Sequence, residues 1–391
     1  MHEIADVEQE LRRAAPHQLV GVVEAALGKR YGARWVELRL ADYGLRTLQL
    51  VERTPGAAPA VPIHDSPQGR AFGAQEPHVT LGFEGVLVHL PVTVRGDRLG
   101  VLTVAFPAGA DVGPALPALG QVCDALGHEI MVAERDTDLY VLARRATRLT
   151  LAAEMQWQLL PGRSCARPEF ALGAHLEPAY AIFGDNYDWS VSAGRLNLTV
   201  TNGMGEGIGA ALLTNLAINA LRNARRAGLG LADQAALADQ AVYAQYRGTA
   251  FVSVLLLSFD LATGEVEAVD AGSPRLWRLR GPSVEAVSFE AQLPLGMFED
   301  STYVPERFQV LPGDRLLFGS DGVYDAVSPE GESYGERALA RALSGTRLLP
   351  PTHVPQAVLR ELAAYHGSSP LEDDALVICL DWHGTPSTVA V

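Results

Sequence analysis

The sequence has few cysteines, a shortage of basic residues and no long apolar run. Its three cysteines, Cys123, Cys165 and Cys379, are too far apart to form a disulfide framework or a zinc-binding pattern. No apolar run is long enough for a membrane-spanning helix. The N-terminal segment 1–16 mixes charged and aliphatic residues and lacks the apolar region of a signal peptide. We therefore expect a cytoplasmic protein.

The charge balance is acidic, with 46 acidic against 31 basic residues and a net charge of −15. Such a surface repels phosphate backbones and anionic lipids, so neither nucleic acid nor a membrane is an expected partner. Two arginine clusters lie on helical patterns, where charged side chains usually face solvent. We expect a solvated face for both of them: Arg144, Arg145 and Arg148, and Arg222, Arg225 and Arg226.

At 391 residues the chain is too long for one ordinary core, so two domains are expected. Apolar residues make up 48% and charged residues 20%, which is typical of a globular protein. The first 110 residues alternate between helical and strand-like patterns. Apolar spacing predicts a helix over 4–27 and strands over 35–40, 45–51, 86–94 and 99–106, the last two joined by a turn at Arg95-Gly96-Asp97.

The run HLPVTVRGDRLGVL at residues 89–102 resembles the signature of GAF domains. The resemblance implies an α/β/α domain over residues 1–115. GAF domains commonly bind small molecules or mediate dimerisation. The sequence contains no motif that names a ligand, so a sensory domain and a purely structural, dimerising domain are both open.

Residues 116–162 carry apolar residues at spacings of three and four, which predicts a long linker helix that either forms a coiled-coil seam or lies against a domain. The phase of the pattern slips at Asp136-Thr137-Asp138. Such a helix either transmits rotation between domains or simply connects them. Pro161 and Gly162 end it.

The remaining residues, 163–391, combine several short strands with a few helices, which predicts an α+β sandwich flanked by helices. The informative positions are acidic residues beside strand-like runs: Asp185, Asp321 and Asp373. Carboxylates that converge from neighbouring strand ends bind hard cations, which prefer oxygen ligands. Glycines next to them allow a close approach of backbone or phosphate.

Eight ordered segments between residues 154 and 381 resemble the SpoIIE-like branch of the PPM-type, metal-dependent protein phosphatases. They are EMQWQLLP at 154–161, PAYAIFGDNYD at 178–188, GMGEG at 203–207, AGSP at 271–274, LPLG at 293–296, LPGD at 311–314, GSDGV at 319–323 and EDDAL at 372–376, with Asn202 directly before the third. The resemblance implies two Mn²⁺ or Mg²⁺ ions, roughly 3.5–4 Å apart, that activate a water for attack on phosphorus.

By position, the resemblance makes Asp185, Asp321 and Asp373 carboxylate ligands with a catalytic role and the carbonyl of Gly203 a backbone ligand. The family has an aspartate that bridges both metals where this chain has Asn202. An asparagine offers one neutral oxygen, so it can bind a cation but cannot supply the bridging charge, and metal affinity depends strongly on ligand charge.

The resemblance implies hydrolysis of phosphoserine or phosphothreonine on a STAS-type regulatory protein, an anti-sigma-factor antagonist. The GAF-like domain and the linker would regulate this activity within a homodimer. The alternative is a pseudophosphatase that keeps the fold and signals by binding, because Asn202 replaces the bridging aspartate.

Overall fold

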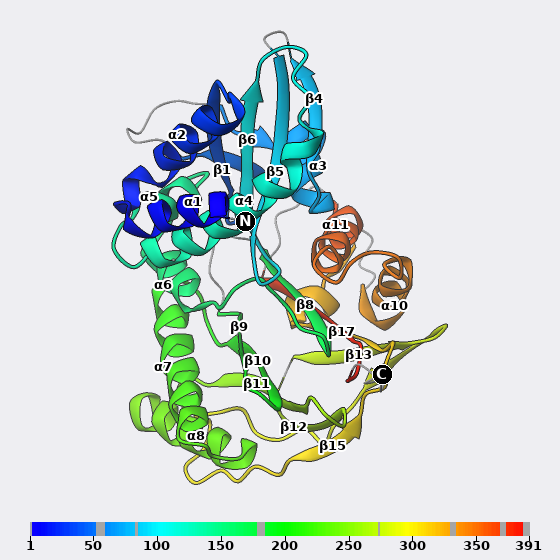
Figure 1. Ribbon diagram of the computed structural model, residues 1–391. Helices are drawn as coiled ribbons and strands as arrows, with labels where there is room; N and C mark the ends of the chain where they lie inside the picture. Colours follow the sequence, from blue (N-terminus) through cyan, green and yellow to red (C-terminus); the bar gives the residue numbers. More distant parts are fainter. Residues whose placement is uncertain are drawn as a thin grey trace. The chain divides into compact units, whose positions relative to one another are not determined.

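The computed structural model describes residues 2–51, 59–82, 85–177, 184–272, 274–328, 334–367 and 373–385 (Figure 1). The chain divides into two compact units, Met1–Arg148 and Leu149–Val391. The division falls inside the segment 116–162 that was predicted as a linker. Within the described ranges, none of the helices combines the length and the hydrophobicity that a transmembrane segment requires.

The N-terminal unit is built on an antiparallel sheet with the strand order β3-β2-β1-β6-β5-β4. The strands are β1 (Trp35–Ala41), β2 (Thr47–Leu50), β3 (Val61–Pro62), β4 (His78–Gly82), β5 (Gly85–Val94) and β6 (Asp97–Phe106). The helices are α1 (His2–Arg13), α2 (Leu19–Tyr31), α3 (Pro67–Ala74), α4 (Leu116–Ala133) and α5 (Leu139–Ala143).

Helices cover both faces of this sheet, because successive strand residues point to opposite sides. Leu40 and Leu102 belong to the large core formed with α1, α2 and α4. Their neighbours Ala41 and Val101 belong to a smaller core that contains Phe72 of α3. The unit is therefore an α/β/α arrangement, and it includes α4, which lies beyond the predicted boundary at residue 115.

The predicted single linker helix is wrong. Residues 116–162 form three helices, α4, α5 and α6 (Leu151–Leu159), separated by turns at 134–138 and by residues 144–150. The apolar positions of α4, among them Leu119, Leu126 and Ile130, are buried in the core of the N-terminal unit. The apolar spacing that suggested a coiled-coil seam is thus used to pack α4 onto its own sheet, which needs the same period.

The C-terminal unit is a sandwich of two antiparallel sheets, with strand orders β15-β12-β11-β10-β9 and β14-β13-β16-β17-β8-β7 (Figure 1). The first sheet contains β9 (Asn186–Val191), β10 (Arg195–Gly203), β11 (Val252–Asp260), β12 (Glu265–Ala271) and β15 (Glu306–Gln309). The second contains β7 (Ser164–Ala166), β8 (Phe170–Glu177), β13 (Arg275–Arg280), β14 (Ser283–Val287), β16 (Arg315–Gly319) and β17 (Ala375–Trp382).

A large apolar core fills the space between the two sheets, with contributions such as Leu198, Phe259, Phe318 and Ile378. Helices α7 (Gly207–Arg226) and α8 (Leu231–Tyr246) pack on the outer face of the first sheet. Helices α9 (Asp321–Tyr324), α10 (Gly335–Gly345) and α11 (Val354–His366) pack on the outer face of the second. The predicted helix-flanked sandwich is the observed arrangement.

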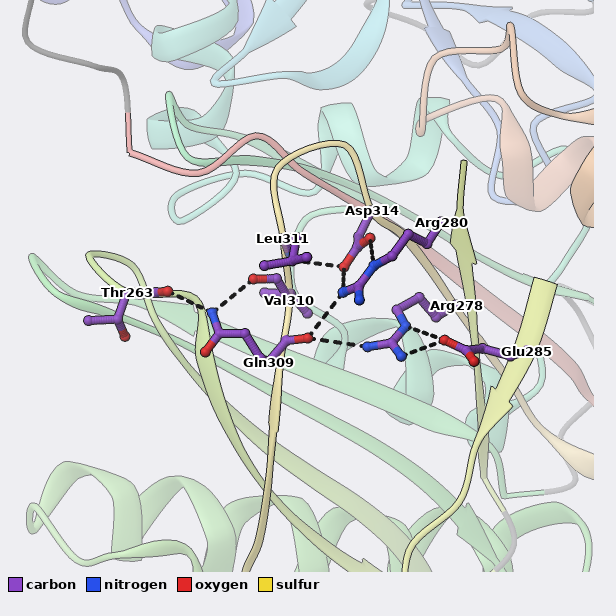
Figure 2. A network of polar contacts seen from close by, with 8 residues as sticks. All are labelled: Thr263, Arg278, Arg280, Glu285, Gln309, Val310, Leu311 and Asp314. Atoms are coloured by element: carbon purple, nitrogen blue, oxygen red, sulfur yellow. Dashed lines mark hydrogen bonds and ion pairs between the residues drawn. The ribbon is translucent and has the colours of Figure 1, made fainter. Parts of the chain in front are cut away.

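A network of arginines closes one end of the sandwich (Figure 2). Arg280 donates to both carboxylate oxygens of Asp314, at 2.7 and 2.6 Å, and Arg278 pairs with Glu285. Both guanidinium groups also donate to the carbonyl of Gln309 in the opposite sheet, at 3.2 and 3.3 Å. These contacts join β13 to β15 at the end of the sandwich farthest from the acidic residues described next.

Candidate functional site

The predicted acidic residues gather at one end of the sandwich because of the strand directions. Asp185 directly precedes β9, and Asn202 and Gly203 end the antiparallel partner β10. Asp321 lies two residues after the end of β16, and Asp373 lies two residues before the antiparallel partner β17. Two neighbouring strand ends from each sheet therefore bring these residues to the same edge.

Two glycines of the predicted motifs are required by close backbone contacts. A Cβ atom on Gly184, whose φ is +109°, would lie 2.0 Å from the carbonyl oxygen of Gly203. The carbonyl of Gly184 accepts from the amide of Gly203 at 3.1 Å and from the hydroxyl of Thr214 in α7 at 2.9 Å. A Cβ on Gly322 would lie 2.0 Å from the carbonyl oxygen of Asp374. Glycine thus allows the acidic loops to pack backbone to backbone.

Asp185 is buried, with 1% of its surface exposed, and its Oδ2 has no hydrogen-bond partner among the described residues. Burial raises the pKa of its carboxyl group well above the ordinary value, and the charges of Asp374, Asp321 and Asp373 raise it further. A buried carboxylate that faces other carboxylates is costly unless a cation compensates it. This feature of the site favours bound cations.

Asn202 occupies the position of the expected bridging carboxylate and hydrogen-bonds to Asp321. Its Nδ2 donates to Asp321 Oδ1 at 2.6 Å, and the amide of Gly322 donates to the same oxygen at 3.0 Å. A carboxylate at position 202 would repel Asp321 instead of binding it. The asparagine therefore stabilises Asp321 Oδ1 in the absence of a cation, although this oxygen is one that a cation would otherwise bind.

Asp373 is half-buried, and burial raises the pKa of its carboxyl group. Its Oδ1 accepts from the amide of Asp374 at 2.8 Å. Asp374 is fully buried, and its Oδ2 lies 3.4 Å from Gln156 Nε2 of α6, which also donates to the carbonyl of Asp185 at 2.7 Å. The sequence reasoning missed Asp374 and Gln156 as parts of this site, although both stand in the quoted motifs.

A cavity of about 350 Å³ opens beside the acidic residues. Asp321 and Asp373 line it together with Asp325, Val327 and His366. The ring Nδ1 of His366 donates to the carbonyl of Val327 at 2.9 Å. The cavity is wide enough for a phosphoryl group and part of the residue that carries it.

Residues 192–383, which all lie within this sandwich, match the family model described as "Stage II sporulation protein E (SpoIIE)". Most of the C-terminal unit thus matches the SpoIIE family model, and we refer to this unit as the SpoIIE domain. The GAF-like assignment of the N-terminal unit lies outside the matched residues and stays a prediction.

The SpoIIE domain is also similar to solved structures. The SiaA-PP2C domain of Pseudomonas aeruginosa is 21% identical with a TM-score of 0.50, over 59% of this chain and 93% of that one. The PP2C phosphatase domain of SpoIIE from Bacillus subtilis was solved with a fragment of its regulatory domain. It is 20% identical with a TM-score of 0.49, over 56% of this chain and 64% of that one. At this identity the first likeness shows the PP2C-type fold alone.

A curated relative, "Protein IcfG" from Synechocystis sp., is 20% identical over 255 residues, which is 58% of this chain. The match spans 40% of that relative's length, so the chain corresponds to less than half of it.

The oxygen atoms of this site are of the kind that binds a divalent cation, but their arrangement does not fit the expected pair of metal ions. Carboxylate oxygens are the ligands that Mn²⁺ and Mg²⁺ prefer, and the unpartnered Oδ2 of Asp185 is available as one. As arranged, no three His, Cys, Asp or Glu side chains of the described residues converge into a metal-holding group. Asn202 does not fit the bridging role, and its amide must turn away from Asp321 before a cation can bind there.

The motif aspartate Asp188 has a structural role. It is 3% exposed and pairs with Arg222 at 2.8 Å and Arg225 at 2.9 Å, which join β9 to α7. Arg222 also donates to the carbonyl of Leu159 at the end of α6. The predicted solvated face is therefore wrong for these two arginines, since a buried carboxylate needs a cationic partner. Of the quoted motifs, residues 178–183, Ser273 and Glu372 lie outside the described residues.

Proposed function

We propose that the protein is a metal-dependent serine/threonine phosphatase whose SpoIIE domain hydrolyses phosphoserine or phosphothreonine on a regulatory protein. The observation that carries the proposal is the buried carboxylate of Asp185, with an unpartnered oxygen, beside Asp321 and Asp373 at the edge of a SpoIIE-family sandwich. Such an arrangement is suited to holding cations and, next to a cavity of this size, to phosphoryl chemistry.

Asp185, Asp321 and Asp373 would hold the cations through their carboxylates, and the carbonyl of Gly203 would add a backbone oxygen. Bound Mn²⁺ or Mg²⁺ would supply a water that is activated at neutral pH and would polarise the phosphoryl oxygens. Asn202, once turned, would present its neutral Oδ1. The site then has one negative charge fewer than the family pattern, so we expect weaker metal binding and turnover only at high metal concentration.

The match to the SpoIIE family model supports a substrate of the STAS type, a phosphorylated anti-sigma-factor antagonist. Regulation by the GAF-like unit, formation of a homodimer and a cytoplasmic location belong to the same proposal. Because three helices take the place of the predicted single linker helix, the proposed homodimer would form through the GAF-like unit or through α4.

The second candidate is a pseudophosphatase that acts by binding. The hydrogen bond from Asn202 Nδ2 to Asp321 Oδ1 favours it, because the acidic edge is held together without a cation. A domain of this kind would keep the fold and recognise the phosphoprotein without cleaving it.

The deciding experiment measures turnover of p-nitrophenyl phosphate and of a phosphoserine protein with added Mn²⁺. It compares the wild type, Asn202→Asp, Asp321→Ala and the surface control Glu265→Gln. Wild-type turnover that is lost in Asp321→Ala and kept in Glu265→Gln supports the enzyme. A silent wild type with an active Asn202→Asp variant would instead support the binding module.

A further inference from the structure

A second cavity, of about 390 Å³, lies between the two sheets of the SpoIIE domain. Its walls are about half polar and half apolar, and the apolar side chains include Leu255 of β11, Leu276 of β13, Val287 of β14 and Phe289. Its one acidic lining residue is Asp270 of β12. The size is typical of a pocket that takes a side chain or a small ligand.

Strand geometry directs the Asp270 side chain toward the space between the sheets. Val266 and Ala268, four and two residues earlier on β12, belong to the core between the sheets. Val269 and Ala271 belong to the core under α7 and α8. Because successive strand residues alternate between faces, Asp270 shares the face of Val266 and Ala268.

Within the described part of the chain, Asp270 has no lysine or arginine partner. Its Oδ1 accepts from the amide of Gly272 at 3.1 Å. Burial raises the pKa of its carboxyl group to about 6; the Gly272 amide lowers it and the charge of Glu306 raises it. The cavity therefore contains an acidic group, with a second one nearby, and Arg275 is the basic residue among the described residues that line it.

The nearby arginines are engaged elsewhere. Arg278 and Arg280 follow Leu276 on the same face of β13, but Glu285, Asp314 and the Gln309 carbonyl hold them at the far end of the sandwich (Figure 2). The guanidinium carbon of Arg275 lies 4.0 Å from the centroid of the Tyr324 ring, in the helix that packs on the outer face. The guanidinium groups of these three arginines are therefore engaged away from Asp270.

Residues that line the cavity lie near the same edge of the sandwich as the acidic site. Arg275, which lines it, pairs with Gly319, two residues before Asp321. Ala271, at the end of β12, pairs with Val254 of β11. The residue before it on β11, Ser253, pairs with Asn202. Since adjacent strands lie about 4.8 Å apart and residues rise about 3.3 Å along a strand, cavity and site are roughly 8–12 Å apart. An extended peptide covers this distance in about two to four residues.

We infer that this cavity binds a lysine or arginine side chain of the phosphoprotein substrate, two to four residues from the phosphorylated residue. The apolar part of the lining suits the aliphatic stem of such a side chain, and Asp270 suits its cationic end. The inference deepens the proposed function and rests on it, because it assigns the flanking residue to the same substrate.

The test measures binding, so that it does not depend on turnover. Fluorescently labelled phosphoserine peptides carry lysine, norleucine or glutamate at positions two, three and four on either side of the phosphoserine. Their affinity for the full chain is read by fluorescence anisotropy, for wild type, Asp270→Asn and the control Glu265→Gln on the same strand. We expect the lysine peptide to bind at least about tenfold tighter than the norleucine peptide, since a hydrogen bond to a charged group is worth that much. Asp270→Asn should remove this ratio and Glu265→Gln should keep it.

The ratio of two peptides cancels any general loss of folded protein in a variant. Equal affinity of the wild type for lysine and norleucine peptides would overturn the inference, as would an unchanged ratio in Asp270→Asn. Binding of free n-butylamine without a lysine preference among the peptides would also overturn it, in favour of a small-molecule site. A wild type that prefers the lysine peptide but never hydrolyses p-nitrophenyl phosphate would overturn the phosphatase proposal and keep the pocket.

Discussion

Replacing Asn202 by aspartate should destabilise the metal-free SpoIIE domain and make its stability depend on Mn²⁺. The change removes the 2.6 Å hydrogen bond from Asn202 Nδ2 to Asp321 Oδ1. A hydrogen bond to a charged group contributes about 1.5–3 kcal/mol. It also places two negative charges side by side, and a pair 4 Å apart repels by about 4 kcal/mol at an effective dielectric constant of about 20.

Both residues are half-buried, and partial protonation relieves some of the repulsion, so we expect a net loss of about 3 kcal/mol in the free energy of unfolding. For a domain of this size that corresponds to a fall of roughly 6–12 °C in melting temperature. Mn²⁺ at 100 times its Kd should restore about 2.7 kcal/mol. The wild type should gain less, because its bridging position is neutral.

The assay is thermal unfolding in EDTA and across a Mn²⁺ titration, followed by fluorescence. Asn197→Asp makes the same chemical change on β10 away from the acidic edge and serves as the matched control. Equal melting temperatures of the metal-free wild type and Asn202→Asp would refute the reasoning. An identical Mn²⁺ shift in both proteins would do so as well.

Three further outcomes follow from the packing around the site. Gln156→Leu removes the donor to Asp374 and to the neighbouring loop carbonyl, and should lower the free energy of unfolding by about 1–3 kcal/mol in urea titrations. Asp188→Leu leaves two arginines unpaired and should cost about 3 kcal/mol, whereas the exposed control Arg226→Ala should stay within about 0.5 kcal/mol. The pKa of Asp270 is about 6 in the folded protein, above its unfolded value. The contribution of this group to the free energy of unfolding should therefore fall as pH rises from 4 to 6 and stay low above that. Asp270→Asn should reduce this difference between melting curves at pH 4.5 and 7.5.

The periodic parts of the fold could be predicted from the sequence. The strand predicted over 35–40 matches β1 except at its last residue, and the strand predicted over 86–94 matches β5 except at its first residue. Apolar side chains of both strands are buried in the cores of the N-terminal unit, so their apolar pattern indicates their structure directly. The helix predicted over 4–27 is interrupted at Pro16, where a short 3₁₀ turn separates α1 from α2.

The failures have one physical cause, which is that the same local pattern serves different tertiary partners. The spacing in α4 suits a coiled coil as well as a sheet face, and only the sheet contacts decide between them. Arg222 and Arg225 resemble surface residues until Asp188, more than thirty positions earlier, is brought beneath them. The contact between Asn202 and Asp321 joins residues 119 positions apart, so no local pattern reports it.

The two ends of the sandwich differ in a way that bears on how the domain opens. At one end, arginines pair with carboxylates of their own sheet and donate to the Gln309 carbonyl of the other sheet (Figure 2). At the other, carboxylates crowd together around the buried Asp185. Local unfolding begins where native contacts contribute least, so amide hydrogens at the start of β9 and the end of β16 should exchange faster than those of β13. The acidic end is thus the least stable part of a well-packed scaffold, and a cation that binds there changes which part of the domain opens first.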